Sequence, residues 1–332
     1  MRPFSEGLLA ASSASTLFVN ARPGGPLPST ARTWTCVQSF RPQADALQAA
    51  GFPVLADWPD GVFDQVLLLL PRQRQRSRGM LARGLRALAP GGVLVASQAN
   101  DEGARSSVAD LERLAGPVQQ LAKHHCRVAW LGPERAAPDD ALIDQWLAED
   151  APRPILDGQA WSRPGVFAWD RVDAGSALLS SHLPAGLSGA AADLGAGWGY
   201  LSLQLRARCP GITSLDLFEA DADALAMARR NLADASIDCR FHWQDVARGI
   251  PGRYDVIVSN PPFHPQARAE DPDLGRAFIA AAAAALRPGG RFWLVANRHL
   301  PYEAALARGF ARWREVAVSG GFKVIEAIGA TP

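Results

Sequence analysis

Residues 62–100 and 253–299 follow one plan, and this internal repeat constrains the fold more than any other feature. In each stretch an aspartate stands at the start of an apolar strand-like run. A loop, an Ala/Leu-rich helix-like segment, Leu-x-Pro-Gly-Gly and a second apolar run follow. Gly-Gly after such a segment is a helix stop signal, and the run behind it is typical of a buried strand. The repeat predicts two α/β domains of common ancestry.

Chain length and composition agree with this plan. The chain has 332 residues, more than one typical domain, with 48% hydrophobic and 20% charged residues, as in an ordinary globular protein. The Pro-containing stretch 149–161 favours a boundary between the repeats. We therefore expect a first domain at 1–150, a linker at 151–162 and a second domain at 163–332.

The two copies differ where chemistry would be expected. Aligned on their opening aspartates, Asn260 falls opposite Leu69 and Phe263 falls opposite Arg72. The first copy also lacks a Gly-x-Gly after an acidic residue. It is therefore expected to keep the fold without the chemistry.

The second copy carries a glycine-rich turn in "AADLGAGWGY" (191–200). Here Asp193 precedes Gly195 and Gly197, and a helix-like pattern follows. Such a turn lets the backbone approach a cofactor at a helix N-terminus, although a plain tight turn is an equal alternative for this motif alone. The Asp-x-Gly-x-Gly order differs from the Gly-x-Gly-x-x-Gly of nicotinamide sites.

Two further acids follow strand-like runs. Glu219 ends the next run, where an acid can accept both hydroxyls of a ribose. Asp245, in "WQDV", falls where the third strand should end. These acids favour a nucleoside-containing cofactor over a simple turn.

The run 254–258 ends in Ser-Asn-Pro-Pro-Phe, and proline cannot continue a β-ladder. The side-chain oxygen of Asn260 and the carbonyl of Pro261 can accept the two N–H bonds of a planar amine. Phe263 can stack on a base, and the prolines, Pro262 included, keep the acceptors rigid. A stiff turn with a core phenylalanine is the alternative. The chemistry requires neither a metal nor a strong general base, because the proton can leave after transfer.

Together these motifs resemble the Rossmann-like S-adenosylmethionine-dependent methyltransferases. Four flanking segments (163–184, 259–264, 289–306 and 320–328) resemble the bacterial ribosomal RNA guanine-N2 methyltransferases. The enzymes acting on guanosine 1207 of 16S rRNA are nearest and the 23S enzymes second. The resemblance is good from residue 163 onward, about half the chain, and mainly architectural before it.

The resemblance implies two tandem methyltransferase-type domains, the amino-terminal one degenerate and serving RNA binding or structural support. It implies S-adenosyl-L-methionine as cofactor and ribosomal RNA or the small ribosomal subunit as partner. The cofactor loop would be Asp193, Gly195 and Gly197, with Glu219 at the ribose and Asp245 at the adenine. The amine and base would meet Asn260, Pro261 and Phe263. Trp198 before Gly199 and the tail "FKVIEAI" depart from the common pattern, so the exact target stays open.

Other residues carry weaker RNA signals. The segment 72–86 has six arginines, a basic run that fits RNA phosphates, with a solvated helix or coding bias as alternatives. His264 is either a base or proton contact or a turn residue. The RNA-contact candidates are Arg72, Arg74, Arg76, Arg78, His264 and Lys323.

Two rival functions remain. Asn-Pro-Pro-aromatic loops also serve methylation of adenine N6 and of protein glutamine, though those relatives more often carry tyrosine. A non-catalytic RNA-binding assembly factor is the second rival, and the joint presence of Asp193, the glycines and Asn260 counts against it.

The composition also bears on location. The four cysteines show no CxxC spacing, and no stretch approaches 18 uncharged apolar residues. We expect a cytoplasmic protein without disulfides, metal or membrane contact. A monomer is expected because the degenerate domain can serve as an internal partner.

Overall fold

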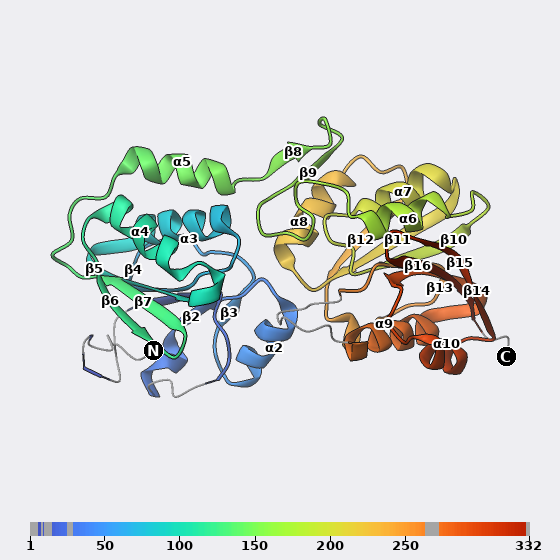
Figure 1. Ribbon diagram of the computed structural model, residues 1–332, viewed down its shortest axis with the longest axis horizontal. Coiled ribbons are helices and arrows are strands. Elements are labelled where there is room, and N and C mark those ends of the chain that lie inside the picture. Colours follow the sequence, from blue (N-terminus) through green and yellow to red (C-terminus); the bar gives the residue numbers. More distant parts are fainter. Residues whose placement is uncertain (1–5, 8, 10–14, 25–28, 263–271, 330–332) are drawn as a thin grey trace. The chain divides into compact units, whose positions relative to one another are not determined.

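The computed structural model describes residues 6–7, 9, 15–24, 29–262 and 272–329. The chain divides into two compact units (Figure 1). The first comprises Met1–Pro152 and Arg163–Gly165, and the second comprises Arg153–Ser162 and Val166–Pro332. The segment expected as a linker, 151–162, contains a hairpin of β8 (Arg153–Ile155) and β9 (Ala160–Ser162), which belongs to the second unit.

The first unit contains a seven-stranded sheet of order β3-β2-β1-β4-β5-β7-β6. Its strands are β1 (Thr16–Val19), β2 (Thr35–Val37), β3 (Val54–Leu55), β4 (Phe63–Leu69), β5 (Leu88–Ala99), β6 (Gln119–Lys123) and β7 (Cys126–Leu131). The helices are η1 (Ser29–Thr33), α2 (Arg41–Ala49), α3 (Arg74–Arg86), η2 (Asn100–Glu102), α4 (Ala104–Ala115) and α5 (Asp140–Asp150).

The second unit repeats this topology with a sheet of order β12-β11-β10-β13-β14-β16-β15. Its strands are β10 (Ser188–Leu194), β11 (Gly211–Glu219), β12 (Asp238–Trp243), β13 (Tyr254–Ser259), β14 (Leu286–Asn297), β15 (Arg312–Ser319) and β16 (Phe322–Ile328). The helices are α6 (Ala174–Ser181), α7 (Tyr200–Arg208), α8 (Ala222–Asn231), η3 (Val246–Arg248), α9 (Pro272–Ala285) and α10 (Glu303–Gly309).

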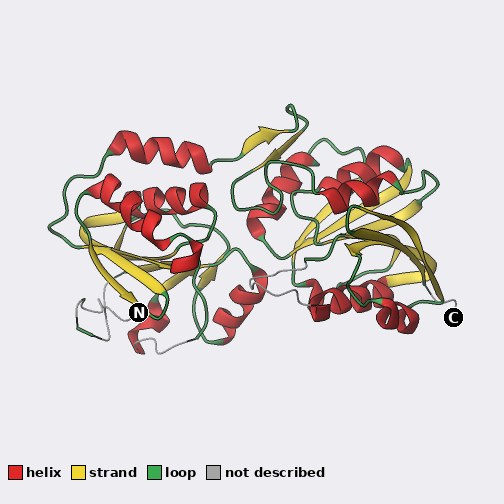
Figure 2. Cartoon of the chain, in the orientation of Figure 1, coloured by secondary structure: helices red, strands yellow, loops and turns green. Residues whose placement is uncertain are grey.

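In both sheets the first five strands in the spatial order are parallel to one another. The sixth strand, β7 or β16, runs antiparallel to both of its neighbours. Helices cover both faces of each sheet (Figure 2). A parallel sheet needs such cover because both of its faces are apolar. In β13, for example, Ile257 packs into one core cluster while Val256 and Val258 pack into the other. The predicted pair of tandem Rossmann-like domains is confirmed.

The sequence predicted that a strand starts after each Pro-Gly-Gly segment, but in the structure the strand starts before it. Both helices end earlier, and β5 and β14 begin at Leu88 and Leu286, so each Pro-Gly-Gly lies inside a strand as an irregularity. The second glycine is required by packing: a Cβ on Gly290 would lie 3.1 Å from the carbonyl oxygen of Asp255. The bulge absorbs the extra residues and keeps β14 in register with β13.

The strand registers of the two units correspond position by position. Thr16 pairs with Gln65 in the first unit, as Ala191 pairs with Val256 in the second. The turn after the first strand also matches, because the same backbone hydrogen bond, 3.2 Å long, closes it in both units. The resulting equivalences are Phe18 with Asp193, Asn20 with Gly195, Gln38 with Glu219, and Leu69 with Asn260.

Candidate active site

The candidate site lies where three neighbouring parallel strands of the second unit end. Gly195 follows β10, Glu219 ends β11 and Asn260 follows β13, and these strands are adjacent in the sheet. Carboxyl ends of parallel strands are the usual place for ligands in open α/β sheets. A pocket here is lined by Phe167, Ala168, Asp173, Ser176, Gly195, Ala196, Gly197, Trp198, Tyr200, Leu201 and Asn260.

The glycine turn has the backbone that its sequence predicted. Gly195 and Gly197 adopt φ of +74° and +56°, in the left-handed region that favours glycine. A Cβ added at Gly197 would meet nothing within 4 Å, so this backbone borders open space. The N–H groups of Gly195 and Ala196 both donate to the carbonyl of Phe218, at 2.8 and 3.2 Å, which anchors the turn to β11. The turn is therefore preformed for close backbone contact.

Glu219 is held by two backbone donors. Its Oε2 accepts from the N–H of Gly197 at 2.7 Å, and its Oε1 accepts from the N–H of Asp221 at 2.8 Å. Burial raises the pKa of Glu219 to about 7, and the two backbone hydrogen bonds oppose that rise. Each carboxylate oxygen keeps a second acceptor position, so the group can receive two hydroxyls.

Asp193 lies beneath the glycine turn and is completely buried. Its Oδ2 accepts from the hydroxyl of Ser202 on α7 at 2.7 Å, and burial raises its pKa to about 7. Its Oδ1 has no hydrogen-bond partner among the described residues. Its predicted part in the cofactor loop stays a prediction, and the observed contact ties β10 to α7.

Asp245 follows β12 and caps η3, with its Oδ1 accepting from the N–H of Ala247 at 3.0 Å. The guanidinium of Arg248 lies 3.7 Å from its other oxygen. Its predicted contact with an adenine edge stays a prediction.

The amide of Asn260 has a defined orientation. Its Nδ2 donates to Asp173 Oδ2 and to Ser176 Oγ, both at 2.8 Å. Its Oδ1 is buried and has no partner among the described residues. Pro261 is buried and Pro262 is exposed, while Phe263 and His264 lie outside the described residues. The site therefore offers an unused amide oxygen, as the predicted amine grip requires.

Phe167, Asp173 and Ser176 are among the pocket residues that the sequence interpretation did not predict. The spacing of Asp173 and Ser176 is a helix-capping signal, which indicates where α6 starts but not that α6 faces a strand end 87 residues later. Phe167 is 67% exposed, unusual for a large apolar side chain that lines a pocket. Its neighbour Ala168 has φ of +48° and accepts a hydrogen bond from the Trp198 indole at 3.2 Å. A strained residue held in this way is typical of functional loops.

In the first unit, the equivalent positions are occupied by amide side chains that hydrogen-bond to backbone groups of the same unit. Gln38 replaces Glu219: its Oε1 accepts from the N–H of Phe40 at 2.9 Å, and its Nε2 donates to the carbonyl of Ala21 at 2.6 Å. Asn20 donates to the carbonyl of Leu69 at 2.9 Å. No carboxylate or glycine remains at these positions, so the first copy is degenerate.

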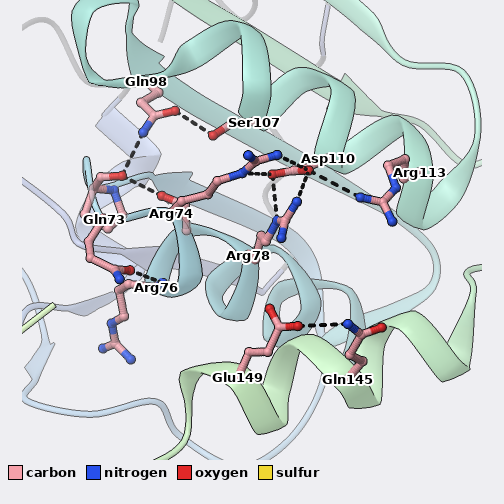
Figure 3. Close-up of polar contacts among 12 residues, drawn as sticks. Gln73, Arg74, Arg76, Arg78, Gln98, Ser107, Asp110, Arg113, Gln145 and Glu149 are labelled. Atoms are coloured by element: carbon pink, nitrogen blue, oxygen red, sulfur yellow. Dashed lines mark hydrogen bonds and ion pairs between the residues drawn. The ribbon is translucent and has the colours of Figure 1, made fainter. Parts of the chain in front are cut away.

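Most of the arginines proposed for RNA contact make ion pairs within the first unit (Figure 3). Arg74 and Arg78 on α3 both reach Asp110 of α4, at 3.3 and 3.0 Å. Burial raises the pKa of Asp110, but hydrogen bonds from the two guanidinium groups outweigh it, so the pKa lies below its usual range. Arg78 also lies over the Trp146 ring of α5, 4.8 Å from its centroid.

The remaining candidates are also largely engaged. Arg76 pairs with Asp150 at 2.9 Å. Lys323 is buried, and its ammonium donates to the carbonyl of Leu300 at 2.8 Å and to Glu303 at 2.7 Å. Arg72 is exposed. These contacts favour a structural role for α3 over an RNA-binding patch. Of the RNA-contact candidates that the structure describes, Arg72 and Arg74 keep the exposure that such a patch needs.

Neither a metal cluster nor a membrane-spanning helix is found in the part of the chain that the structure describes. Across these ranges, no group of three or more His, Cys, Asp or Glu residues is placed to hold a metal ion. Of the helices that the structure describes, none is both long and apolar enough to span a membrane.

The fold is that of an S-adenosylmethionine-dependent methyltransferase, with an Asn-Pro-Pro sequence directly after β13. The family model for the Methyltransferase small domain matches residues 157–326. Ribosomal RNA small subunit methyltransferase C of Pseudomonas aeruginosa (strain LESB58) is 34% identical over 271 residues, 81% of this chain and 80% of the relative. The chain belongs to the ribosomal RNA small subunit methyltransferase C family.

More distant relatives agree. The protein of that name from Psychromonas ingrahamii is 29% identical over 81% of this chain and 77% of the relative. A solved structure, the Thermus thermophilus enzyme described as "16S rRNA N2 G1207 methyltransferase (RsmC) in complex with AdoMet and Guanosine", superposes with a TM-score of 0.79. That match has 29% identity and covers 95% of this chain and 88% of the other. Because it covers 95% of this chain, the match extends over both units.

Proposed function

We propose that this protein transfers the methyl group of S-adenosylmethionine to the exocyclic N2 amine of a guanosine in 16S rRNA, at the position equivalent to 1207. The observation that carries the proposal is the buried, unused Oδ1 of Asn260 in a pocket that the glycine turn also lines. An acceptor that is buried without a partner is costly unless a ligand donor meets it. The family relationship supports the same activity, and the similarity to the Thermus N2 G1207 enzyme supports the choice of base and position.

The residues present fit the cofactor. The open backbone at Gly197 leaves room for a ligand, and Glu219 keeps two acceptor positions for ribose hydroxyls. Asp193 would support the turn from below, and Asp245 would lie toward the adenine. When bound, the cofactor supplies an electrophilic methyl group on a sulfonium.

The protein's contribution to transfer is orientation of the amine. The lone pair of a guanine N2 amine is delocalised into the ring, so the amine is a weak nucleophile. Oδ1 of Asn260 and the carbonyl of Pro261 would accept its two N–H bonds, aim the nitrogen and favour its pyramidal form. Phe263 would stack on the base, and the proton would leave after transfer without a strong general base.

The first unit would then act as support. Its ion pairs join α3 to α4, and the positions equivalent to the cofactor residues hold amide side chains that hydrogen-bond to backbone carbonyls. We place the degenerate domain, expected at 1–150, in the first unit, and the catalytic domain, expected at 163–332, in the second unit together with the β8–β9 hairpin. Arg72 and Arg74 remain candidates for RNA phosphates. We further propose a cytoplasmic monomer, which light scattering after size exclusion can test.

Methyl transfer from labelled cofactor tests the function. Naked 16S and 23S rRNA, free small subunits and whole ribosomes are offered in parallel, and the modified nucleotide is mapped. Label on a 16S guanosine N2 supports the proposal. Label on 23S rRNA, on adenine N6 or on a protein glutamine would replace it with one of its rivals. Cofactor-independent RNA binding with no transfer to any substrate would favour an assembly factor.

A further inference from the structure

We infer that Asp173, together with Ser176, is a positioning residue that holds the Asn260 amide with its oxygen toward the target amine. This inference rests on the proposed function. Both N–H bonds of the Asn260 amide are used, one on Asp173 Oδ2 and one on Ser176 Oγ, each at 2.8 Å. The oxygen of the same amide is left buried and unused among the described residues.

The chemistry of the partner sets the direction of the amide. A carboxylate oxygen can only accept, so the side of Asn260 that faces Asp173 has to be its NH2 group. If the amide turned over, its oxygen would meet a carboxylate oxygen and its NH2 would point toward the donors of the substrate. The flipped amide would therefore lose its hydrogen bond to Asp173, keep at most the one to Ser176, whose hydroxyl can also donate, and oppose the incoming amine.

Asp173 is itself fixed by the start of α6. The oxygen that accepts from Asn260 also accepts from the backbone N–H of Ser176 at 2.9 Å, as the N-cap of the helix. Gly175 keeps the turn tight, because an added Cβ would lie 3.1 Å from Asp173 Oδ2 and 3.1 Å from the Phe322 ring. One carboxylate oxygen thus links the N-terminus of α6 to the strand end that carries the amide.

This arrangement explains why the Asn260 amide oxygen is buried without a hydrogen-bond partner among the described residues, which is otherwise costly. An amide with both donors paired and its acceptor empty is preorganised, since no protein bond must break before the substrate binds. Without Asp173, the amide could rotate and satisfy its own oxygen. Asp173 should therefore affect the rate of transfer more than the affinity for cofactor.

Asp173→Ser is the decisive variant. Serine caps helices about as well as aspartate but is too short to retain the bond to Asn260. We expect kcat for methyl transfer to fall at least tenfold, with the Kd for S-adenosylmethionine changed less than twofold. Ser176→Ala, which keeps the backbone cap donor, should lower kcat by a smaller factor. Asp139→Ser is the matched control, because Asp139 caps α5 in the first unit in the same way, at 2.9 Å from the N–H of Leu142.

A double-mutant cycle separates positioning from general stability. In an Asn260→Ser background, where the short hydroxyl cannot reach Asp173, adding Asp173→Ser should change kcat less than twofold. Equal losses in both backgrounds would overturn the inference, as would a kcat for Asp173→Ser that matches Asp139→Ser.

An NMR measurement tests the inference apart from activity. The side-chain NH2 protons of Asn260, identified by their absence in Asn260→Ser, should exchange slowly with solvent in the wild type and faster in Asp173→Ser. Exchange as fast as that of an exposed asparagine in the wild type would overturn the inference. Protected protons in an enzyme that methylates no RNA would instead support the positioning contact and refute the proposed function.

Discussion

Replacing Glu219 by glutamine tests the cofactor site most directly. The carboxylate accepts one backbone N–H on each oxygen, from Gly197 at 2.7 Å and from Asp221 at 2.8 Å. Under the proposed function each oxygen would also accept one ribose hydroxyl. Glutamine has a single acceptor oxygen, so its NH2 group must face one of the two backbone donors. Gln38, the equivalent of Glu219 in the first unit, shows this arrangement: its NH2 group donates to the carbonyl of Ala21, so one side of the amide no longer accepts.

The expected magnitude follows from the bonds lost. The variant loses one ribose hydrogen bond to a charged acceptor, worth about 1.5–3 kcal/mol, and weakens the other by removing the charge. We expect cofactor binding to weaken by about 2–4 kcal/mol, a roughly 30- to 1,000-fold higher Kd. The free energy of unfolding should change little. Burial already disfavours the charged form of this carboxyl, as its pKa of about 7 shows, so losing the charge offsets part of the cost of the lost backbone hydrogen bond.

Isothermal titration of S-adenosylmethionine at pH 8, with thermal unfolding of the free proteins, measures both effects. Glu315→Gln, an exposed substitution on β15, is the control. A Kd for Glu219→Gln within threefold of wild type would refute the assignment of the carboxylate as ribose acceptor. A large fall in Tm would show instead that its backbone hydrogen bonds are mainly structural.

Four further outcomes are expected. Asn260→Ala should lower kcat by at least about 100-fold by removing the oriented acceptor, with cofactor Kd unchanged; retained single-turnover activity would contradict this. Cofactor binding should release protons near pH 6.5 and should weaken as the pH falls. Burial raises the pKa of Glu219 to about 7, so part of the free protein is protonated at this pH, whereas the ribose donors favour the ionised form. Titration in buffers of different ionisation enthalpy checks the sign of the proton release. Phe167→Ala should raise KM for RNA about tenfold if the exposed ring stacks on the target base, and an unchanged KM would exclude that contact. Asp110→Ala should lower the free energy of unfolding of the first unit by about 3 kcal/mol in urea, because it leaves the poorly exposed Arg78 without its carboxylate partner. Arg74→Ala should lower it by less than about 1 kcal/mol, because the Arg74 side chain is 60% exposed.

The fold could be predicted because it repeats. Two copies of the same strand, helix and Pro-Gly-Gly pattern require the same α/β unit, and both sheets have the same strand order. The alignment also placed Leu69 opposite Asn260, and the strand registers agree. Apolar periodicity and glycine punctuation are local signals, so they are visible along the chain.

The arginine-rich run shows where such signals stop. Its spacing suits a basic patch, yet Arg74 and Arg78 meet Asp110, a residue more than thirty positions later on another helix. The charge count of a segment does not reveal which carboxylates the fold brings beside it. Lys323 was predicted as an RNA contact from its charge alone, and the sequence likewise does not show that its ion-pair partner is Glu303 on α10.

By itself, the sequence determined the duplicated architecture, and it predicted an inactive half and the residue types of the site, because glycine turns, strand ends and an Asn-Pro-Pro loop are short-range patterns. Only the tertiary structure decided which way the Asn260 amide points. That direction depends on Asp173 and Ser176, which α6 brings to the end of β13 from 87 and 84 positions away. A hydrogen bond has a direction in space, and no pattern along the chain specifies it until the elements are packed.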